Sequence, residues 1–187
     1  MKKYWDHTIT FDEYLRIAEQ RVQNPATDAD REFKPYYELG LQRMERALKT
    51  FKTDEQQAEV LKKKNFDGKI LIISEAWCGD ASATVPALVR FFEPDNEVRI
   101  FLRDSDVSLI DQFQTNGTQS IPKVLVLNHD FTLRATWGPR PAAGNEMLRK
   151  YKENPESYTQ EEFYNDLQVY YAKNKGRDAI DEILNLI

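Results

Sequence analysis

The sequence predicts an α/β protein in which helices flank a central mixed sheet. The apolar run from Lys69 to Ile73, bounded by Asp67-Gly68, is typical of a strand that is buried on both faces. Four apolar residues at helical spacing follow it: Ala81, Val85, Leu88 and Phe92. The chain therefore turns from a buried strand into a helix at Trp77-Cys78-Gly79.

The length and the charge of the chain limit its domain organisation and its partners. A chain of 187 residues is long enough for one domain with extensions. The net charge of -5 argues against nonspecific binding to nucleic acids and to anionic membranes, so we expect neither as a partner. No segment approaches the roughly 18 consecutive apolar residues of a membrane span, and Met1–His7 lacks the apolar region of a secretory signal. We therefore expect a cytoplasmic protein.

Residues 1–65 are predicted to form a helical N-terminal extension. Thr10 and Glu13 match a capping box for the first helix, which ends at Asn24-Pro25. A second helix carries a one-sided apolar stripe, and a third is expected to begin at Thr53 and to end near Asn65. The stripe consists of Tyr37, Leu41, Met44, Leu48 and Phe51. Packing against the sheet is the simplest role for these helices.

The region after the helix at Cys78 alternates between predicted strands and a short helix. Strands are expected at Val98–Leu102, from Ser120-Ile121-Pro122 to Leu127, and at Thr132–Trp137, with a short helix over Val107–Gln114. In the last strand, Leu133, Ala135 and Trp137 are expected to point inward. Beyond Pro141, residues 142–187 are predicted to be helical, with an interruption at Asn154-Pro155 and a stop at Lys175-Gly176.

Several of these features occur together in one known family. The order of a strand, Trp77-Cys78-Gly79, a helix with an internal Pro86, Ser120-Ile121-Pro122, a hairpin and Gly138 resembles that of thioredoxin-like proteins. The resemblance covers Phe66 to Pro141. It implies the thioredoxin fold for a core of residues 66–141, within one folded unit that includes both extensions. It also implies a cis peptide before Pro122.

The same resemblance implies a reactive groove and roles for its residues. Cys78 would be the nucleophile at the start of a helix, beside Trp77, because helix N-termini favour a thiolate over a thiol. The substrate would be held by residues of the loops around it, namely Gly79, Ile121, Pro122 and Gly138.

One departure from the family limits the chemistry. Thioredoxins carry the motif C-G-P-C, whereas this chain has Cys78-Gly79-Asp80-Ala81 and no other cysteine. Cys78 could therefore begin thiol–disulfide exchange but would need glutathione, another small thiol or a partner protein to complete it. No further cofactor and no metal site is expected.

Asp80 is expected to modulate the pKa of Cys78. A carboxylate roughly 6 Å from the sulfur raises the thiol pKa by about one unit, which nearly cancels the effect of the helix end. The sequence thus predicts a pKa near the free-cysteine value of about 8.5, unless a cation such as Arg140 lies close. Glu75 is a conceivable buried proton carrier, since the buried aspartate of the family aligns with the apolar Ile72.

Two functions remain open at this point. The first is monothiol thiol–disulfide exchange, or redox homeostasis, through Cys78. The second is a redox-inactive binding module that uses the groove around Trp77, Pro122 and Gly138. The partner or substrate and the oligomeric state are left open by the sequence. Reactivity of Cys78 toward a small disulfide separates the two.

Overall fold

The sheet is mixed and four-stranded, as the sequence predicts for the class. The structure, a computed structural model, describes residues 1–187. The strand order is β2-β1-β3-β4, in which β1 pairs parallel with β2 and antiparallel with β3, and β4 pairs antiparallel with β3. The strands span Lys69–Ser74 (β1), Glu97–Leu102 (β2), Lys123–Leu127 (β3) and Leu133–Trp137 (β4).

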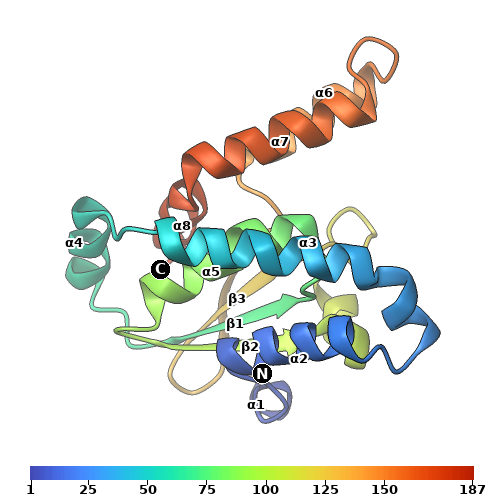
Figure 1. The fold of residues 1–187 in the computed structure, drawn as a ribbon. Coiled ribbons are helices and arrows are strands. Elements are labelled where there is room, and N and C mark those ends of the chain that lie inside the picture. Colours follow the sequence, from blue (N-terminus) through green and yellow to red (C-terminus); the bar gives the residue numbers. More distant parts are fainter.

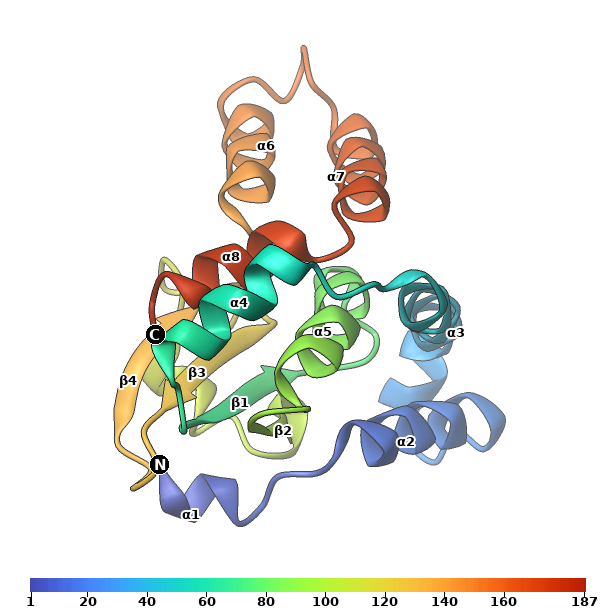
Figure 2. The ribbon, with the colours of Figure 1, turned by 90° about the vertical axis from the view of Figure 1, so that its left-hand side faces the viewer.

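Helices cover the sheet and extend beyond it (Figures 1 and 2). Figure 2 shows α6 and α7 rising from the body as a helical hairpin, with α8 and α4 beneath them and α2 and α3 on the opposite side of α5. The helices are α1 (Lys2–Trp5), α2 (Phe11–Gln23), α3 (Asp28–Thr50), α4 (Glu55–Lys64), α5 (Gly79–Phe92), α6 (Ala142–Glu153), α7 (Gln160–Asn174) and α8 (Arg177–Leu184).

The central strand β1 is buried on both faces, which confirms the interpretation of its apolar run. Ile70 and Ile72 belong to a large core cluster with residues of α2, α3, α5 and α8. Leu71 and Ile73 point the other way, into a smaller cluster that contains Tyr4 of α1. Because the larger cluster includes side chains from all three parts of the chain, we propose that residues 1–65, 66–141 and 142–187 fold as one unit.

Helix α3 lies close against the turn that carries the candidate site. Thr27 and Asp30 form a capping box at its start, and its buried face carries Tyr37 and Met44. Gly40 is buried, and a Cβ added there would lie 2.2 Å from the carbonyl oxygen of Ala76. Only glycine permits this approach between α3 and the segment just before Cys78.

The C-terminal helices close the other side of the core. α8 lies on α4, where Gln57 donates a hydrogen bond to Asp181 (2.7 Å) and Lys64 donates one to the carbonyl of Ile187 (2.6 Å). The cap of α4 is Asp54, whose side chain accepts from two backbone N–H groups, and not Thr53 as expected. An aspartate carboxylate offers a stronger acceptor to the helix end than a threonine hydroxyl.

Helices α6 and α7 pack on one another through their own small core. Tyr151 of α6 stacks on Phe163 of α7 with ring centroids 5.6 Å apart, and Leu167 and Tyr171 continue the same face of α7. The hairpin therefore has a small core of its own, which supports α7 on the side that faces α6.

Two further local predictions are wrong, and one helix was not predicted. The predicted helix at 107–114 consists of a turn followed by a short 3₁₀ segment, Ile110–Phe113. The N-terminus contains an extra helix, α1, which the sequence analysis did not predict. Leu133 is 41% exposed because a register shift near Val126/Leu127 moves this end of the edge strand β4 out of the inward alternation.

The contact at Gly40 generates the first prediction. Helix propensity alone predicts that Gly40→Ala stabilises the protein by about 1 kcal/mol. Because the new methyl group would meet the Ala76 carbonyl, we expect a loss of about 1 to 3 kcal/mol in the free energy of unfolding instead. Urea denaturation measures the change.

Gln42→Ala, at an exposed position two residues along α3, serves as the matched control and should be close to neutral. A Gly40→Ala protein with a higher urea midpoint than the wild type would show that α3 does not press on the site turn as described.

Candidate functional site

The single cysteine lies where the buried strand gives way to helix α5. Cys78 is the N-cap residue, with extended backbone (φ -75, ψ 124), and its carbonyl accepts the first hydrogen bond of the helix from the N–H of Ser82 (2.9 Å). The side chain is half-buried between the two core clusters. Its thiol donates a hydrogen bond of 3.4 Å to the carbonyl of Ile121. Cys78 is therefore fixed by its backbone at the start of α5 and by the contact of its sulfur with Ile121.

The structure brings Cys78 together with the loop that the sequence analysis singled out. The Ile121–Pro122 peptide is cis. Gly138 has φ +111, and a Cβ there would lie 2.3 Å from the carbonyl oxygen of Pro122, so this turn requires glycine. A second cis peptide, Gly138–Pro139, follows directly. Ile121, Pro122 and Gly138 thus form one packed unit beside the thiol.

Trp77 is fixed beside the site by aromatic and charged neighbours. Its indole N–H donates to the carboxylate of Asp104 (3.0 Å). The ring of Phe33, from α3, lies 4.9 Å away between centroids, and the guanidinium of Arg103 lies 4.9 Å from the Trp77 ring. The indole is therefore a rigid wall next to Cys78.

Asp80 joins three separate parts of the chain. The residue is only 7% exposed, and its carboxylate forms an ion pair with Arg140 (2.6 Å), from the loop after β4. It also accepts a hydrogen bond of 2.8 Å from the hydroxyl of Tyr171, on α7. Burial raises the pKa of Asp80, whereas Arg140 and Tyr171 oppose that rise. Burial, together with the nearby carboxylate, raises the pKa of Tyr171 well above its ordinary value.

The environment of Cys78 disfavours the thiolate. Burial is the largest cause, and the charge of Asp80 adds to it, so that the pKa of Cys78 rises to about 11. The backbone N–H groups of Ala81 and Asp80 and the charge of Arg140 lower it by less. The expected Cys78 pKa near 8.5 is therefore wrong. The prediction from the sequence balanced the effect of the helix end against that of Asp80 and left out burial, which is the largest cause.

Glu75 belongs to a separate buried cluster. It is fully buried and accepts hydrogen bonds from the N–H of Asp104 (2.9 Å) and from Arg21 (3.2 Å). Burial raises its pKa. These contacts tie α2 to the segment after β2, and Glu75 does not line the cavity that contains Cys78.

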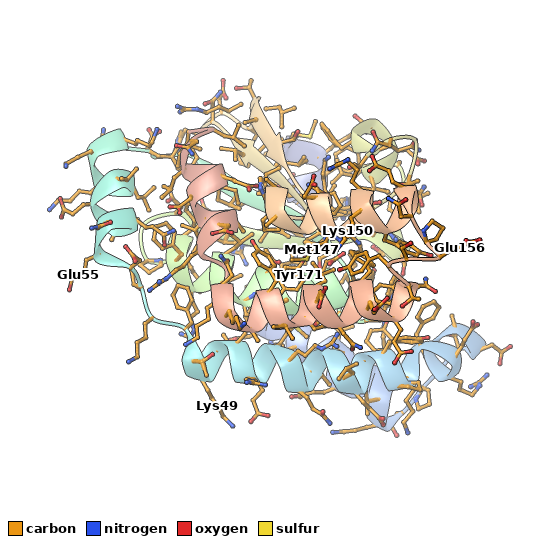
Figure 3. All side chains as sticks on the ribbon, turned by 90° about the horizontal axis from the view of Figure 1, so that it is seen from above. Lys49, Glu55, Met147, Lys150, Glu156 and Tyr171 are labelled. Atoms are coloured by element: carbon orange, nitrogen blue, oxygen red, sulfur yellow. The ribbon has the colours of Figure 1, made fainter.

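A cavity of about 420 Å³ opens beside Cys78, between α3 and α7. Figure 3, seen from above, shows α7 lying alongside α3, with α6 on its other side. The turn contributes Trp77 to Asp80, and Arg140 adds a cation. The two helices contribute Phe33, Tyr36, Leu39, Gly40, Arg43, Tyr164, Leu167 and Gln168.

The helical extensions are thus walls of the cavity, which the sequence analysis did not predict. Ile121, Pro122 and Gly138 are not among its lining residues, and Ile121 alone bonds to the thiol, through its carbonyl oxygen. The one available signal was the aromatic and cationic content of the polar face of α3, with Phe33, Tyr36 and Arg43 at spacings of three and seven. Nothing in the sequence of α7 indicates that it faces α3.

A comparison with protein-family models places this fold among known families. The model described as "Thioredoxin" matches residues 26–153, which is more than half of the chain. The chain belongs to the thioredoxin family. The match begins just before α3 and ends with α6, so the family similarity is wider than the 66–141 segment that carries the motif resemblance.

Two solved structures share the fold of this thioredoxin-family protein. One is a protein of unknown function from Pseudomonas aeruginosa, with a TM-score of 0.61, 19% identity and coverage of 97% of this chain and 92% of that chain. The other is an HIV epitope-scaffold, with a TM-score of 0.57, 18% identity and coverage of 95% and 97%. A comparison with curated proteins gave no match. The likeness therefore concerns the fold, including the helices outside the core.

No helix of this thioredoxin-family protein combines the length and the apolar character needed to cross a bilayer.

The charge of Asp80 generates a prediction for the thiol. Asp80→Asn removes the carboxylate that disfavours the thiolate while Arg140 stays close, so the pKa of Cys78 should fall by about one unit from its wild-type value. The pH dependence of iodoacetamide alkylation measures both values, and the wild-type midpoint should lie at about 11.

Asp104→Asn removes a carboxylate that bonds to Trp77 but does not act on the thiol, so it should leave the midpoint unchanged. An unchanged midpoint in Asp80→Asn would contradict the assignment of Asp80 as a pKa modulator.

Proposed function

We propose that this thioredoxin-family protein performs monothiol thiol–disulfide exchange through Cys78. The observation that carries the proposal is the placement of the only sulfur nucleophile on the wall of a cavity of about 420 Å³, with Ala81 at the position of a second thiol. Ala81 is fully buried on the first turn of α5, and the chain has no cysteine besides Cys78 that could resolve a mixed disulfide.

The exchange divides into two balanced steps. The Cys78 thiolate attacks one sulfur of a small disulfide, forming a mixed disulfide and releasing the other half as a thiolate, which takes up a proton. A second small thiol, as its thiolate, then attacks the mixed disulfide at the sulfur of the bound half. It forms a new small disulfide and returns Cys78 as a thiolate. Glutathione or another low-molecular-weight thiol is the proposed co-substrate.

The neighbouring residues take supporting roles in this proposal. Asp80 adds to burial in raising the pKa of the resting thiol, and Trp77 forms a rigid side wall. Gly79 provides backbone surface to the bound disulfide within the cavity, and Ile121, Pro122 and Gly138 provide it to the part of the disulfide that extends past the cavity lining. The cytoplasm is the proposed setting, because a reducing compartment keeps a single thiol free and supplies small thiols.

A raised thiol pKa favours a second candidate, the redox-inactive binding module. With a pKa of about 11, only roughly one molecule in ten thousand carries a thiolate at neutral pH. The thiol also donates a hydrogen bond to the carbonyl oxygen of Ile121, which stabilises the neutral form. In this second function, Trp77, Pro122 and Gly138 bind a partner and Cys78 is a structural contact.

Stopped-flow reaction with a small disulfide distinguishes the two candidates. Exchange requires that the rate at Cys78 rises tenfold per pH unit between pH 7 and 10, as expected for attack by a thiolate with a pKa of about 11. A binding module is indicated if folded protein stays unreactive throughout this range while the urea-unfolded chain reacts.

The missing second thiol generates a prediction for turnover. The wild type should not reduce a protein disulfide catalytically when electrons come only from a thioredoxin reductase, because each attack ends as a mixed disulfide. Ala81→Cys restores two thiols on one helical turn and should give measurable turnover, followed as NADPH consumption.

Ala83→Cys provides the matched control, since it adds a cysteine to the same helix at a spacing that cannot close a ring with Cys78. It should be as inactive as the wild type. Turnover by the wild type without any added small thiol would sink the monothiol assignment.

A further inference from the structure

The groove between α3 and α7 is strongly cationic in a protein whose net charge is negative. A second cavity of about 200 Å³ continues the first and shares Arg43 and Gln168 with it. Together their walls carry four cationic side chains and one carboxylate, Asp80, in a chain of net charge -5. The four cationic residues are Arg43, Arg46, Arg140 and Lys175.

The one carboxylate on these walls, that of Asp80, already has partners within the chain. Asp80 is bound by Arg140 and by Tyr171 and is buried below the groove. Arg43, Arg46 and Lys175 make no ion pair within the chain. Three positive charges on the groove are thus left for a ligand. A cleft lined by charges of one sign concentrates counter-ions of the other sign.

Arg43 is the central residue of this set. It is half-buried, and burial lowers its pKa, with the charge of Asp80 as the only opposing influence. Its guanidinium makes no side-chain hydrogen bond, and one nitrogen would lie 3.3 Å from a Cβ added at Gly79. A partly desolvated, unpartnered guanidinium next to the Cys78 turn is costly unless an acceptor arrives from outside.

A second unsatisfied donor lies on the same wall. The Nε of Arg140 is buried and has no hydrogen-bond partner, although its terminal nitrogen is paired with Asp80. Two arginines, Arg43 and Arg140, therefore line the cavity that contains the thiol, and each has a donor without a partner within the chain. Guanidinium groups bind carboxylates and phosphates through paired hydrogen bonds.

We infer that this groove binds the anionic end of a low-molecular-weight thiol, or of its disulfide, whose sulfur reaches Cys78. The inference rests on the proposed exchange and names its substrate class: a small molecule with at least one carboxylate or phosphate group. Arg43 contacts the anionic group, Arg46 and Lys175 attract it along the second cavity, and Phe33 and Leu167 pack against its apolar part.

The size of the site supports a small molecule over a protein. Small-molecule sites enclose about 300 to 1,000 Å³, and a cavity of about 420 Å³ falls within that range. The ligand would lie between two helices, with α3 on one side and α7 on the other (Figure 3). The chemistry follows the two steps of the exchange, with the anionic disulfide as the electrophile and the anionic thiol as the reductant.

Two small disulfides that differ in charge test the inference. Dithiobis(nitrobenzoate) carries two carboxylates, whereas dithiodipyridine is neutral, and both react with the same Cys78 thiolate. The ratio of their second-order rate constants therefore cancels any change in the thiol pKa. In Arg43→Gln this ratio should fall about tenfold, the effect of one lost charge-assisted contact.

Arg16→Gln provides the control, because it removes the same charge from an exposed position on α2 that lines neither cavity. Its ratio should equal that of the wild type. Arg46→Gln should give a smaller decrease than Arg43→Gln, and added salt should slow only the anionic reagent in the wild type.

The outcomes separate the inference from the function on which it rests. If both reagents react and the ratio of their rate constants is the same in Arg43→Gln and Arg16→Gln, the proposed anion site is wrong, whereas the proposed exchange is not contradicted. If neither reagent reacts with folded protein at any pH up to 10, the exchange and the substrate assignment both fail. A lower ratio with dithiodipyridine unaffected supports the site.

Discussion

The buried carboxylate of Asp80 is the contact on which the geometry of the site depends. It joins the first turn of α5 to Arg140, after β4, and to Tyr171, in the last turn of α7. Removing one partner of a buried ion pair typically costs about 3 to 5 kcal/mol, so the position of α7 over the site is strongly coupled to this residue. The same charge raises the pKa of Cys78. One side chain therefore links the elements around the cavity and adds to the effect of burial on its thiol.

The core of the fold could be predicted from the sequence because its signals are local. The run at Lys69–Ile73 has no polar face, and it is buried on both sides as β1. The turn at Cys78 and the stop at Lys175-Gly176 also lie where the pattern indicates, the latter with two residues at positive φ. Leu133 could not be placed correctly, since a register shift depends on the pairing of β3 and β4 and not on the alternation within one strand.

The site was predicted only in part, because some of its features are local in the sequence and others depend on tertiary contacts. Cys78 and the Ile121-Pro122 loop are marked by motifs, and the structure brings them into contact. The walls contributed by α3 and α7 depend on contacts between residues far apart in the sequence, such as Asp80 with Tyr171. The desolvation of Cys78 has the same origin, because it arises from how the surrounding segments pack. A pKa prediction that considers only the helix end and the charge of Asp80 could not include this desolvation.

In this thioredoxin-family protein a single, protonated thiol lies on the wall of a small cationic cavity. The proposed function requires that Cys78 forms a mixed disulfide and cannot release it alone. Intact mass spectrometry after incubation with a small disulfide at pH 9 tests this requirement most directly. We expect one stable adduct on Cys78 that persists after the reagent is removed and disappears when a small thiol is added. An unchanged mass, with the thiol still free, would contradict it.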